Sequence, residues 1–256
     1  MTAPKILVYD IETSPLVSYT WQTFKTNVIK VKQEWNVLSI AWQWHGRPKI
    51  YDASIPDWEG FDGDMTNDYG VVATCMDLFD EADVVVAHNG DGFDQRKIRA
   101  RALIHGMDPP VPFKSIDTLK LVRQHFALTS NRLDGVAQVL GIGEKHETGG
   151  FSTWEGCMEG DPKAWARMVR YNRHDVRLLD QVYDRLLPWR LNGVNLAAYG
   201  DKPDACPKCG IAGKMLSKGY RNNAVTRRRL WRCENCRGIV AGRALEKLPV
   251  THTNVI

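Results

Sequence analysis

Two acidic side chains near the start of the chain have the types and spacing of ligands for a hard metal ion. Asp10 and Glu12 end the apolar run KILVY, at residues 5–9, which predicts a buried strand. Residues two apart in a strand point to the same face. Two neighbouring carboxylates repel, so burial would raise one pKa strongly unless a cation such as Mg²⁺ or Mn²⁺ neutralised them. An exposed strand-end pair that bonds a helix N-terminus is the alternative for this triplet alone.

A third carboxylate lies beyond a second predicted strand. The run VVVAH at 84–88 predicts that strand, the turn NGDG follows, and the spacing of apolar residues from Phe93 to Gly106 predicts a helix. Asp94 therefore lies in the first turn of a helix just beyond a strand's carboxyl end, where open α/β sheets gather ligands. The alternative is that Asp94 only complements the helix dipole.

A fourth carboxylate lies in a long predicted helix. Asp161 and Pro162 form an N-cap and a first helical position, and apolar residues recur at helical spacing until Pro188. Tyr171 and Asp175 are four apart and share one face of this helix, so the phenol could orient a water beside a metal-bound carboxylate. An ordinary surface aspartate with a half-buried tyrosine would have the same spacing. His174 faces elsewhere on the helix and is expected to be a surface residue or to support the site from outside.

These motifs, taken in order, resemble those of the DEDD (DnaQ-like) 3′→5′ exonuclease superfamily, tyrosine subclass. The three motifs of that superfamily are D-x-E, N-x-x-x-F-D and Y-x-x-x-D, and here they are Asp10–Glu12, Asn89–Asp94 and Tyr171–Asp175. The resemblance covers roughly residues 1–190. Two positions bear on this resemblance. Asp91 departs from the family pattern by adding a carboxylate inside the second motif. Arg170 stands where the histidine subclass has its histidine, so the tyrosine subclass fits better.

The resemblance implies an α/β, RNase H-like fold, with a mixed sheet of about five strands flanked by helices. It also implies two catalytic Mg²⁺ or Mn²⁺ ions about 4 Å apart. Carried over to this sequence, Asp10 would bridge both ions, Glu12 and Asp175 would hold the ion beside the nucleophile, and Asp94 would hold the other ion through water. Tyr171 would position the attacking water. The nucleic-acid contacts expected at the second motif are Asn89 and Phe93.

The remaining segments up to residue 200 contain few candidate site residues. The runs NVLSIAWQW and PKIYDASI predict a hairpin through His45–Arg47, which gives three sequential strands before the first helix. Asp117 is expected to cap the helix that follows it. The polar, glycine-rich stretch at 144–160 is expected to be a loop, either a mobile border of the active site or a plain connector. The expected domains are an exonuclease-type domain at 1–200 and a small zinc ribbon with a basic tail at 201–256.

Four of the six cysteines form two matched pairs near the end of the chain. Cys206 and Cys209 form one C-x-x-C pair, Cys233 and Cys236 form the other, and 23 residues separate the pairs. This spacing is typical of a zinc ribbon, in which four thiolates satisfy one structural Zn²⁺ ion. A module of this size has little core, so zinc would supply much of its folding energy. Disulfides or a redox pair are the alternatives, but no secretory signal or thioredoxin-like context accompanies the motif.

Charge divides the chain at the same place. Residues 201–256 carry 12 basic and 4 acidic side chains, whereas residues 1–200 carry 22 basic and 26 acidic ones. The densest basic stretch also contains an aromatic ring, and both types of side chain suit nucleic-acid contact. Its members are Arg227, Arg228, Arg229, Trp231 and Arg232. The alternative is a solvated, charged hairpin between the two cysteine pairs.

Taken together, these features favour a metal-dependent 3′→5′ exonuclease that acts on single-stranded or frayed DNA ends and releases nucleoside monophosphates. A ribonuclease or a structure-specific endonuclease on the same fold is the alternative within this class. A catalytically silent nucleic-acid adaptor is the alternative from another class. DNA is the expected partner, RNA is its alternative, and a separate DNA polymerase or replication protein could be a further one. No stretch resembles a membrane span, and the expected location is the cytoplasm of a bacterium or of a virus-infected host cell.

Overall fold

The computed structural model describes residues 4–143, 149–191, 193–222 and 226–247 and divides into two compact units. The first unit is Lys5–Val182, and the second comprises the described residues from Tyr183 onward together with Pro4. Residues 183–200, which the sequence interpretation assigned to the first domain, pack in the second unit. The functional domains 1–200 and 201–256 stay a prediction.

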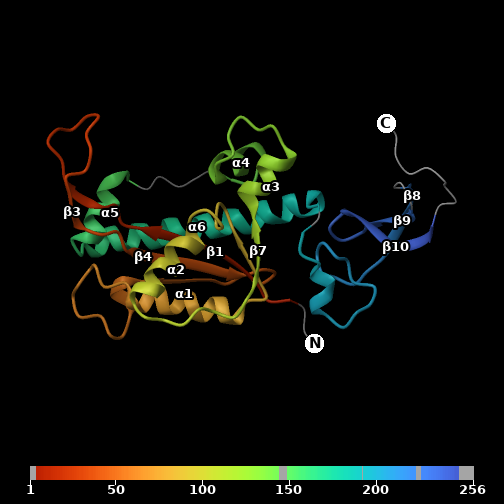
Figure 1. Cartoon of the computed structure of the whole chain (residues 1–256), viewed down its shortest axis with the longest axis horizontal. Helices are drawn as coiled ribbons and strands as arrows, with labels where there is room; N and C mark the ends of the chain where they lie inside the picture. Colours follow the sequence, from red (N-terminus) through yellow and green to blue (C-terminus); the bar gives the residue numbers. More distant parts are fainter. Residues whose placement is uncertain (1–3, 144–148, 192, 223–225, 248–256) are drawn as a thin grey trace. The chain divides into compact units, whose positions relative to one another are not determined.

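The first unit contains the predicted mixed sheet (Figure 1). Its strands, in the order in which they lie side by side, are β5 (Ile50–Ser54), β4 (Val37–Trp44), β1 (Ile6–Thr13), β6 (Val84–Ala87) and β7 (Lys114–Asp117). β1 is antiparallel to β4 and parallel to β6, and β4 and β5 form the predicted hairpin. This arrangement confirms the predicted fold class. One separate hairpin, β2 (Val17–Tyr19) and β3 (Lys30–Gln33), was not predicted.

Six α-helices occur among the described residues of the first unit and its boundary. They are α1 (Tyr69–Glu81), α2 (Asp94–Ile104), α3 (Thr118–His125), α4 (Leu133–Val139), α5 (Phe151–Met158) and α6 (Pro162–Leu186). Asp161 caps α6 as predicted, because its Oδ1 accepts from the Lys163 N–H at 2.9 Å.

The prediction of a loop at 144–160 is wrong for residues 151–158, which form α5. The partly buried Trp154 packs against the core and Cys157 is fully buried, so packing supports a helix in a stretch whose glycines suggested none. Residues 144–148 lie outside the described residues.

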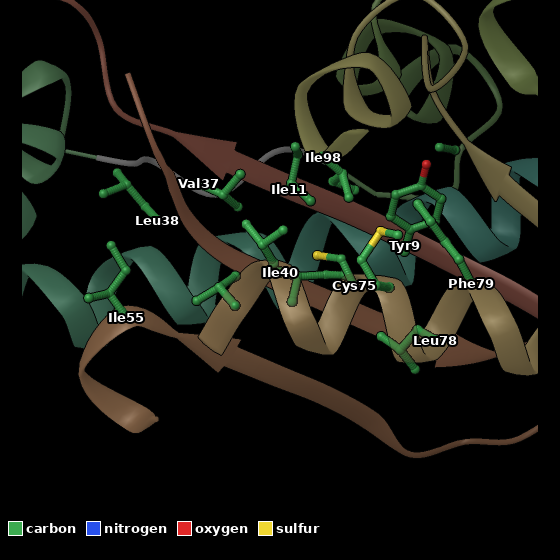
Figure 2. Close-up of a cluster of buried hydrophobic side chains, with 14 of the residues drawn as sticks. Tyr9, Ile11, Val37, Leu38, Ile40, Ile55, Cys75, Leu78, Phe79 and Ile98 are labelled. Atoms are coloured by element: carbon green, nitrogen blue, oxygen red, sulfur yellow. The ribbon is translucent and has the colours of Figure 1, made fainter. Parts of the chain in front are cut away.

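Alternation along β1 separates the apolar core from the acidic pair. Tyr9 and Ile11 point toward α1, where the Tyr9 and Phe79 rings meet edge to face at 5.3 Å (Figure 2). Asp10 and Glu12 consequently lie on the opposite face of the sheet. α6 covers that face, as shown by the 3.2 Å hydrogen bond from the Gln43 side chain of β4 to Asp180 of α6.

The second unit is built around a three-stranded antiparallel sheet. Its strands are β8 (Met215–Asn222), β9 (Thr226–Cys233) and β10 (Ile239–Lys247), in the order β10–β9–β8. The described residues also include three short 3₁₀-helices: η1 (Ile55–Asp57) in the first unit, and η2 (Leu187–Trp189) and η3 (Leu196–Tyr199) in the second. Within the described ranges, no helix combines the length and the apolar character needed to span a bilayer.

Candidate functional site

β1 and α6 bring together three of the four predicted carboxylates. One oxygen from each of Asp10, Glu12 and Asp175 lies within 4.8 Å of the others. Tyr171, one helical turn before Asp175, is buried and shares a hydrogen bond with the Asp175 carboxylate. The Trp154 ring of α5 lies edge-on to the Tyr171 ring, with 6.3 Å between their centroids. The structure thus gathers, from segments 160 residues apart, the groups that the D-x-E and Y-x-x-x-D motifs singled out.

Asp94 lies beside this cluster but does not belong to the group of mutually close oxygens. Its buried side chain accepts a hydrogen bond from the Ile11 N–H at 3.3 Å, and Ile11 lies between Asp10 and Glu12. A tight turn returns the chain to this position: Asn89 has a φ of 71°, and a Cβ at Gly90 would lie 2.5 Å from that of Ala87. Asp94 could therefore reach an ion in the cluster through a bridging water.

The electrostatics of the cluster favour bound cations. Burial first, and then the negative charges of three neighbouring carboxylates, raise the pKa of Asp10 well above its usual range. Burial raises the pKa of Asp94 to about 7, although the Ile11 N–H opposes this change. The pKa of the Tyr171 hydroxyl is also raised, first by burial and then by the charges of Asp175 and Glu12. Without metal, the site therefore retains protons that divalent cations would displace.

Asn172 is a site residue that sequence reasoning missed. It is fully buried, and its Nδ2 donates to the Asp10 carbonyl at 3.1 Å and to Asp10 Oδ2 at 2.8 Å. Its Oδ1 accepts from the Ser39 hydroxyl of β4 at 3.2 Å. Asn172 therefore fixes the Asp10 carboxylate and is itself held by the next strand. Its place inside the Y-x-x-x-D motif was the one available signal.

The other acidic residues near the second motif have structural partners. Asp117 caps α3 as predicted, because Oδ1 accepts from the N–H groups of Leu119 and Lys120 at 3.0 and 3.3 Å. Asp91 accepts from the Lys120 ammonium at 2.6 Å and from the Ser115 hydroxyl at 2.5 Å. Burial raises the pKa of Asp91, but these hydrogen bonds outweigh it and the net change is downward. Asp91 is thus oriented toward β7 and α3, and it is not one of the clustered carboxylates.

A pocket of about 530 Å³ borders the carboxylates, with Asp175 in its lining. Its polar and basic lining comes largely from His88, Arg123 and the segment 129–134. The His88 ring is fixed by the Thr118 hydroxyl and the Asn131 carbonyl, each at 2.9 Å. Asn89 and Phe93, the predicted nucleotide contacts, are exposed in the neighbouring turn. His174 is partly buried one residue before Asp175.

The four paired cysteines converge in the second unit. Their sulfurs lie within 4.8 Å of one another, and Sγ–Sγ distances of 3.9 Å join Cys206 to Cys236 and Cys209 to Cys233. Two matching turns present them: the Gly210 N–H donates to the Cys206 carbonyl at 2.7 Å, and the Arg237 N–H donates to that of Cys233 at 2.9 Å. None of these four cysteines is in a disulfide. A tetrahedral ion with Zn–S bonds near 2.3 Å would separate the sulfurs by about 3.8 Å, so the cluster has the dimensions of a zinc site.

Strand alternation divides the predicted basic stretch between two faces of β9. Arg227, Arg229 and Trp231 share one face, and Arg228 and Arg232 lie on the other. On the first face, the Arg229 guanidinium lies 5.3 Å from the Tyr220 ring and 5.5 Å from the Trp231 ring, and it donates to the Tyr220 hydroxyl at 2.8 Å. We call Tyr220, Arg227, Arg229 and Trp231 the ring face. Tyr220 joins it from β8, a partner that the sequence interpretation missed.

Comparison with known proteins identifies the family. A family model described as the RNase_H superfamily matches residues 59–187, half of the chain, so this chain belongs to the RNase_H superfamily. The matched range contains Asp94, Tyr171 and Asp175, whereas Asp10 and Glu12 precede it.

One solved structure is similar to a larger share of the chain. A family B DNA polymerase from the hyperthermophilic archaeon Pyrobaculum calidifontis is similar over 73% of this chain, with a TM-score of 0.53 and 20% sequence identity. The similar region is 25% of the polymerase chain, and at this identity the likeness establishes the fold alone. No curated protein matches the chain.

Proposed function

We propose that this protein is a metal-dependent 3′→5′ exonuclease of the DEDD type, tyrosine subclass, which removes nucleoside monophosphates from single-stranded or frayed DNA ends. One observation carries the proposal: the carboxylate oxygens of Asp10, Glu12 and Asp175 lie within 4.8 Å of one another, beside the buried Asp94. The superfamily and the motif order support it. The exonuclease direction and the preference for DNA derive from the motif resemblance.

The carboxylate cluster fits two Mg²⁺ or Mn²⁺ ions. Carboxylate oxygens are hard donors, and the raised pKa of Asp10 shows that its negative charge is poorly stabilised without a cation. Asp10, Glu12 and Asp175 would supply the direct ligands. Asp94 would act through water. When bound, such ions activate the attacking water and neutralise the charge that develops on the leaving 3′ oxygen.

The protein's own groups would orient the reaction. The Tyr171 hydroxyl keeps its proton because its pKa is raised, so it can serve as a neutral hydrogen-bonding partner that positions the attacking water beside Asp175. Asn172 holds the Asp10 carboxylate in a fixed orientation. Hydrolysis joins the water oxygen to phosphorus and breaks the bond from phosphorus to the 3′ oxygen, which leaves with a proton. Asn89 and Phe93 would contact the terminal nucleotide.

In the second unit, we propose a structural Zn²⁺ bound by Cys206, Cys209, Cys233 and Cys236. The tetrahedral dimensions of the sulfur cluster support this assignment. The ribbon would bind nucleic acid through its excess of basic side chains, for which the ring face offers ordered guanidinium groups and aromatic rings.

A time course with oligonucleotides labelled at the 3′ or 5′ end tests the activity. With Mg²⁺ or Mn²⁺, the wild type should shed mononucleotides from the 3′ end of DNA, and chelation should stop it. Asp10→Ala should reduce turnover by more than about 100-fold, because loss of a ligand should cost more than the 10- to 100-fold typical of its supporting residues. Near-normal activity of Asp10→Ala would disprove the metal-site assignment.

The same time course separates the alternative functions. Faster cleavage of RNA than of DNA would indicate a ribonuclease, and internal cuts would indicate an endonuclease. Tight binding without metal-dependent cleavage of either polymer would indicate an adaptor. The four carboxylates and Tyr171 argue against an adaptor, because an inactive protein would not need this arrangement.

A further inference from the structure

The unpredicted hairpin of the first unit carries the densest exposed aromatic surface among the described residues. We call residues 16–33 the aromatic arm. Trp21 is 88% exposed, Phe24 is 73% exposed and Tyr19 is 56% exposed. Exposed apolar residues are ordinary when they are scattered, but these three lie within six positions, together with the exposed Leu16, Val28 and Ile29. In Figure 1 the arm is the red loop that extends beyond β3. A cluster of this kind indicates a binding surface.

The base of the arm is fixed to the strand that carries the acidic pair. Ser14 and Asn36 are both buried and form three hydrogen bonds across the base: Ser14 N–H to the Asn36 carbonyl at 2.9 Å, Asn36 N–H to Ser14 Oγ at 2.9 Å, and Ser14 Oγ to Asn36 Oδ1 at 2.7 Å. Ser14 is two residues beyond Glu12. Val17, the start of β2, is five positions beyond Glu12, so their Cα atoms are at most about 18 Å apart.

The charge of the arm is opposite to that of the domain around it. Its charged residues are Lys25, Lys30 and Lys32, with no acidic residue between 16 and 33, whereas residues 1–200 have four more acidic than basic side chains. The Lys25 ammonium lies 5.5 Å from the centroid of the Phe24 ring. Lysines interleaved with exposed rings match a chain of phosphates that also presents unpaired, flat bases.

We propose that the aromatic arm binds single-stranded nucleic acid and guides it to the carboxylates of β1. This inference rests on the proposed function. Bases would stack on Trp21 and Phe24, and the three lysines would contact the phosphates. Unpaired bases are required, because only they present free faces to the rings. Since the arm continues directly from the strand that holds Asp10 and Glu12, a strand held on the arm is retained within reach of the site.

Binding measured in the Asp10→Asn background tests the arm without degradation of the probe. The probe is a fluorescent single-stranded oligothymidylate, and anisotropy gives its Kd. The double variant Trp21→Leu/Phe24→Leu, which keeps apolar side chains but removes the rings, should weaken binding by tenfold or more, on the order expected for loss of base stacking. Leu103→Ala, which changes an 80% exposed residue of α2, is the matched control and should leave Kd unchanged.

A charge variant provides an independent measurement. Lys25→Gln/Lys30→Gln/Lys32→Gln should reduce the slope of log K against log salt by about 2, because each phosphate contact on a single strand contributes about 0.7. An unchanged Kd in the ring variant and an unchanged slope in the lysine variant would overturn the proposal. The proposal would also be overturned if the arm variants bound the oligonucleotide normally and lost only self-association, or only binding to phosphatidylserine vesicles.

A small substrate separates this inference from the proposed function. Thymidine 5′-p-nitrophenyl phosphate contains one base and one phosphate, so it offers the arm no run of bases or phosphates to hold. If the wild type hydrolyses it, the arm variants should do so at the same rate, and a parallel loss would show that they damage the site. If the wild type cleaves neither this ester nor any oligonucleotide, yet the arm variants lose oligonucleotide binding, the nuclease proposal fails and the arm inference stands.

Discussion

The Asn172 side chain holds Asp10 by two hydrogen bonds, one to its carbonyl at 3.1 Å and one to its Oδ2 at 2.8 Å, although 162 positions separate the two residues. The bond to Oδ2 lowers the pKa of Asp10, against the larger opposing effects of burial and of the neighbouring carboxylates. Asn172 thus favours the ionised form that a metal ligand needs. A residue of α6 in this way orients a carboxylate on β1 and partly offsets the rise in its pKa.

Replacement of Asn172 by alanine should therefore impair metal binding and shift its pH dependence. We expect the apparent Mn²⁺ affinity and turnover to fall by about 10- to 100-fold, the range typical of residues that orient metal ligands. Loss of the donor raises the pKa of Asp10 further, so the rise of activity with pH should move to higher pH. Calorimetric Mn²⁺ titration and a pH–rate profile measure the two effects.

Ser39→Ala is the matched control for Asn172→Ala. It removes the hydroxyl that donates to Asn172 Oδ1 at 3.2 Å but leaves the amide contact with Asp10 in place, so its effect should be smaller. If Asn172→Ala lowered only the melting temperature and left the pH profile and the Mn²⁺ affinity unchanged, Asn172 would be a packing residue and not a positioning one.

Asp94→Asn should stabilise the metal-free protein at alkaline pH. The pKa of Asp94 is raised to about 7 in the folded state, above the value near 3.9 of an unfolded aspartate. A carboxyl whose pKa is higher in the folded state costs no stability below its unfolded-state pKa. It lowers the free energy of unfolding progressively as the pH rises from that value to its folded-state pKa. Asparagine retains the oxygen that accepts from the Ile11 N–H, so the variant should gain on the order of a few kcal/mol at pH 8, about a third as much at pH 5, and almost nothing at about pH 3.

Thermal unfolding of both proteins between pH 5 and pH 8 measures this difference. Saturating Mn²⁺ should reverse the order at pH 8, because a ligand that binds the folded state better stabilises it more, and the wild type has the additional carboxylate. A variant that is less stable than the metal-free wild type at every pH would show that the Asp94 carboxylate is satisfied without a cation.

Cys233→Ser should unfold the ribbon and spare the nuclease chemistry. Three thiolates bind zinc more weakly than four, and a sheet of this size depends on its metal for folding. We expect loss of bound zinc, a changed Trp231 emission and proteolytic cleavage within β8–β10, while hydrolysis of thymidine 5′-p-nitrophenyl phosphate continues. Cys75→Ser, at a buried cysteine of α1, is the control and should keep its zinc. Full zinc content in Cys233→Ser would contradict the ligand assignment.

Local sequence patterns predicted those parts of the structure that depend on interactions between neighbouring residues. The apolar runs that became β1, β4 and β6 are continuous or alternating, and the N-cap at Asp161 and the cap at Asp117 depend only on neighbouring N–H groups. The cysteine pairs likewise depend on fixed local spacing. The conformation of each of these features is determined by residues within the same short segment.

Features that depend on register or on distant packing escaped prediction. Asn172 reaches Asp10 only because β1 and β4 pair Glu12 with Ser39 beneath α6. Tyr220 meets Arg229 because β8 and β9 pair them across an irregularity in the register. The helix α5 forms in a glycine-rich stretch because tertiary packing overrides weak propensity.

The two faces of β9 provide the final prediction, a comparison at constant charge. Arg227→Gln/Arg229→Gln changes the ring face, and Arg228→Gln/Arg232→Gln removes the same charge from the other face. Because aromatic rings hold the first pair of guanidinium groups in place, those groups lose less freedom on contact with phosphate. Fluorescence anisotropy with single-stranded DNA measures both variants. The ring-face variant should lower the slope of log K against log salt by about 1.4, or 0.7 for each phosphate contact. It should also weaken binding more than the other variant does. Equal losses would mean that the ribbon contributes only its total charge, and unchanged binding in both variants would assign the ribbon to a partner other than nucleic acid.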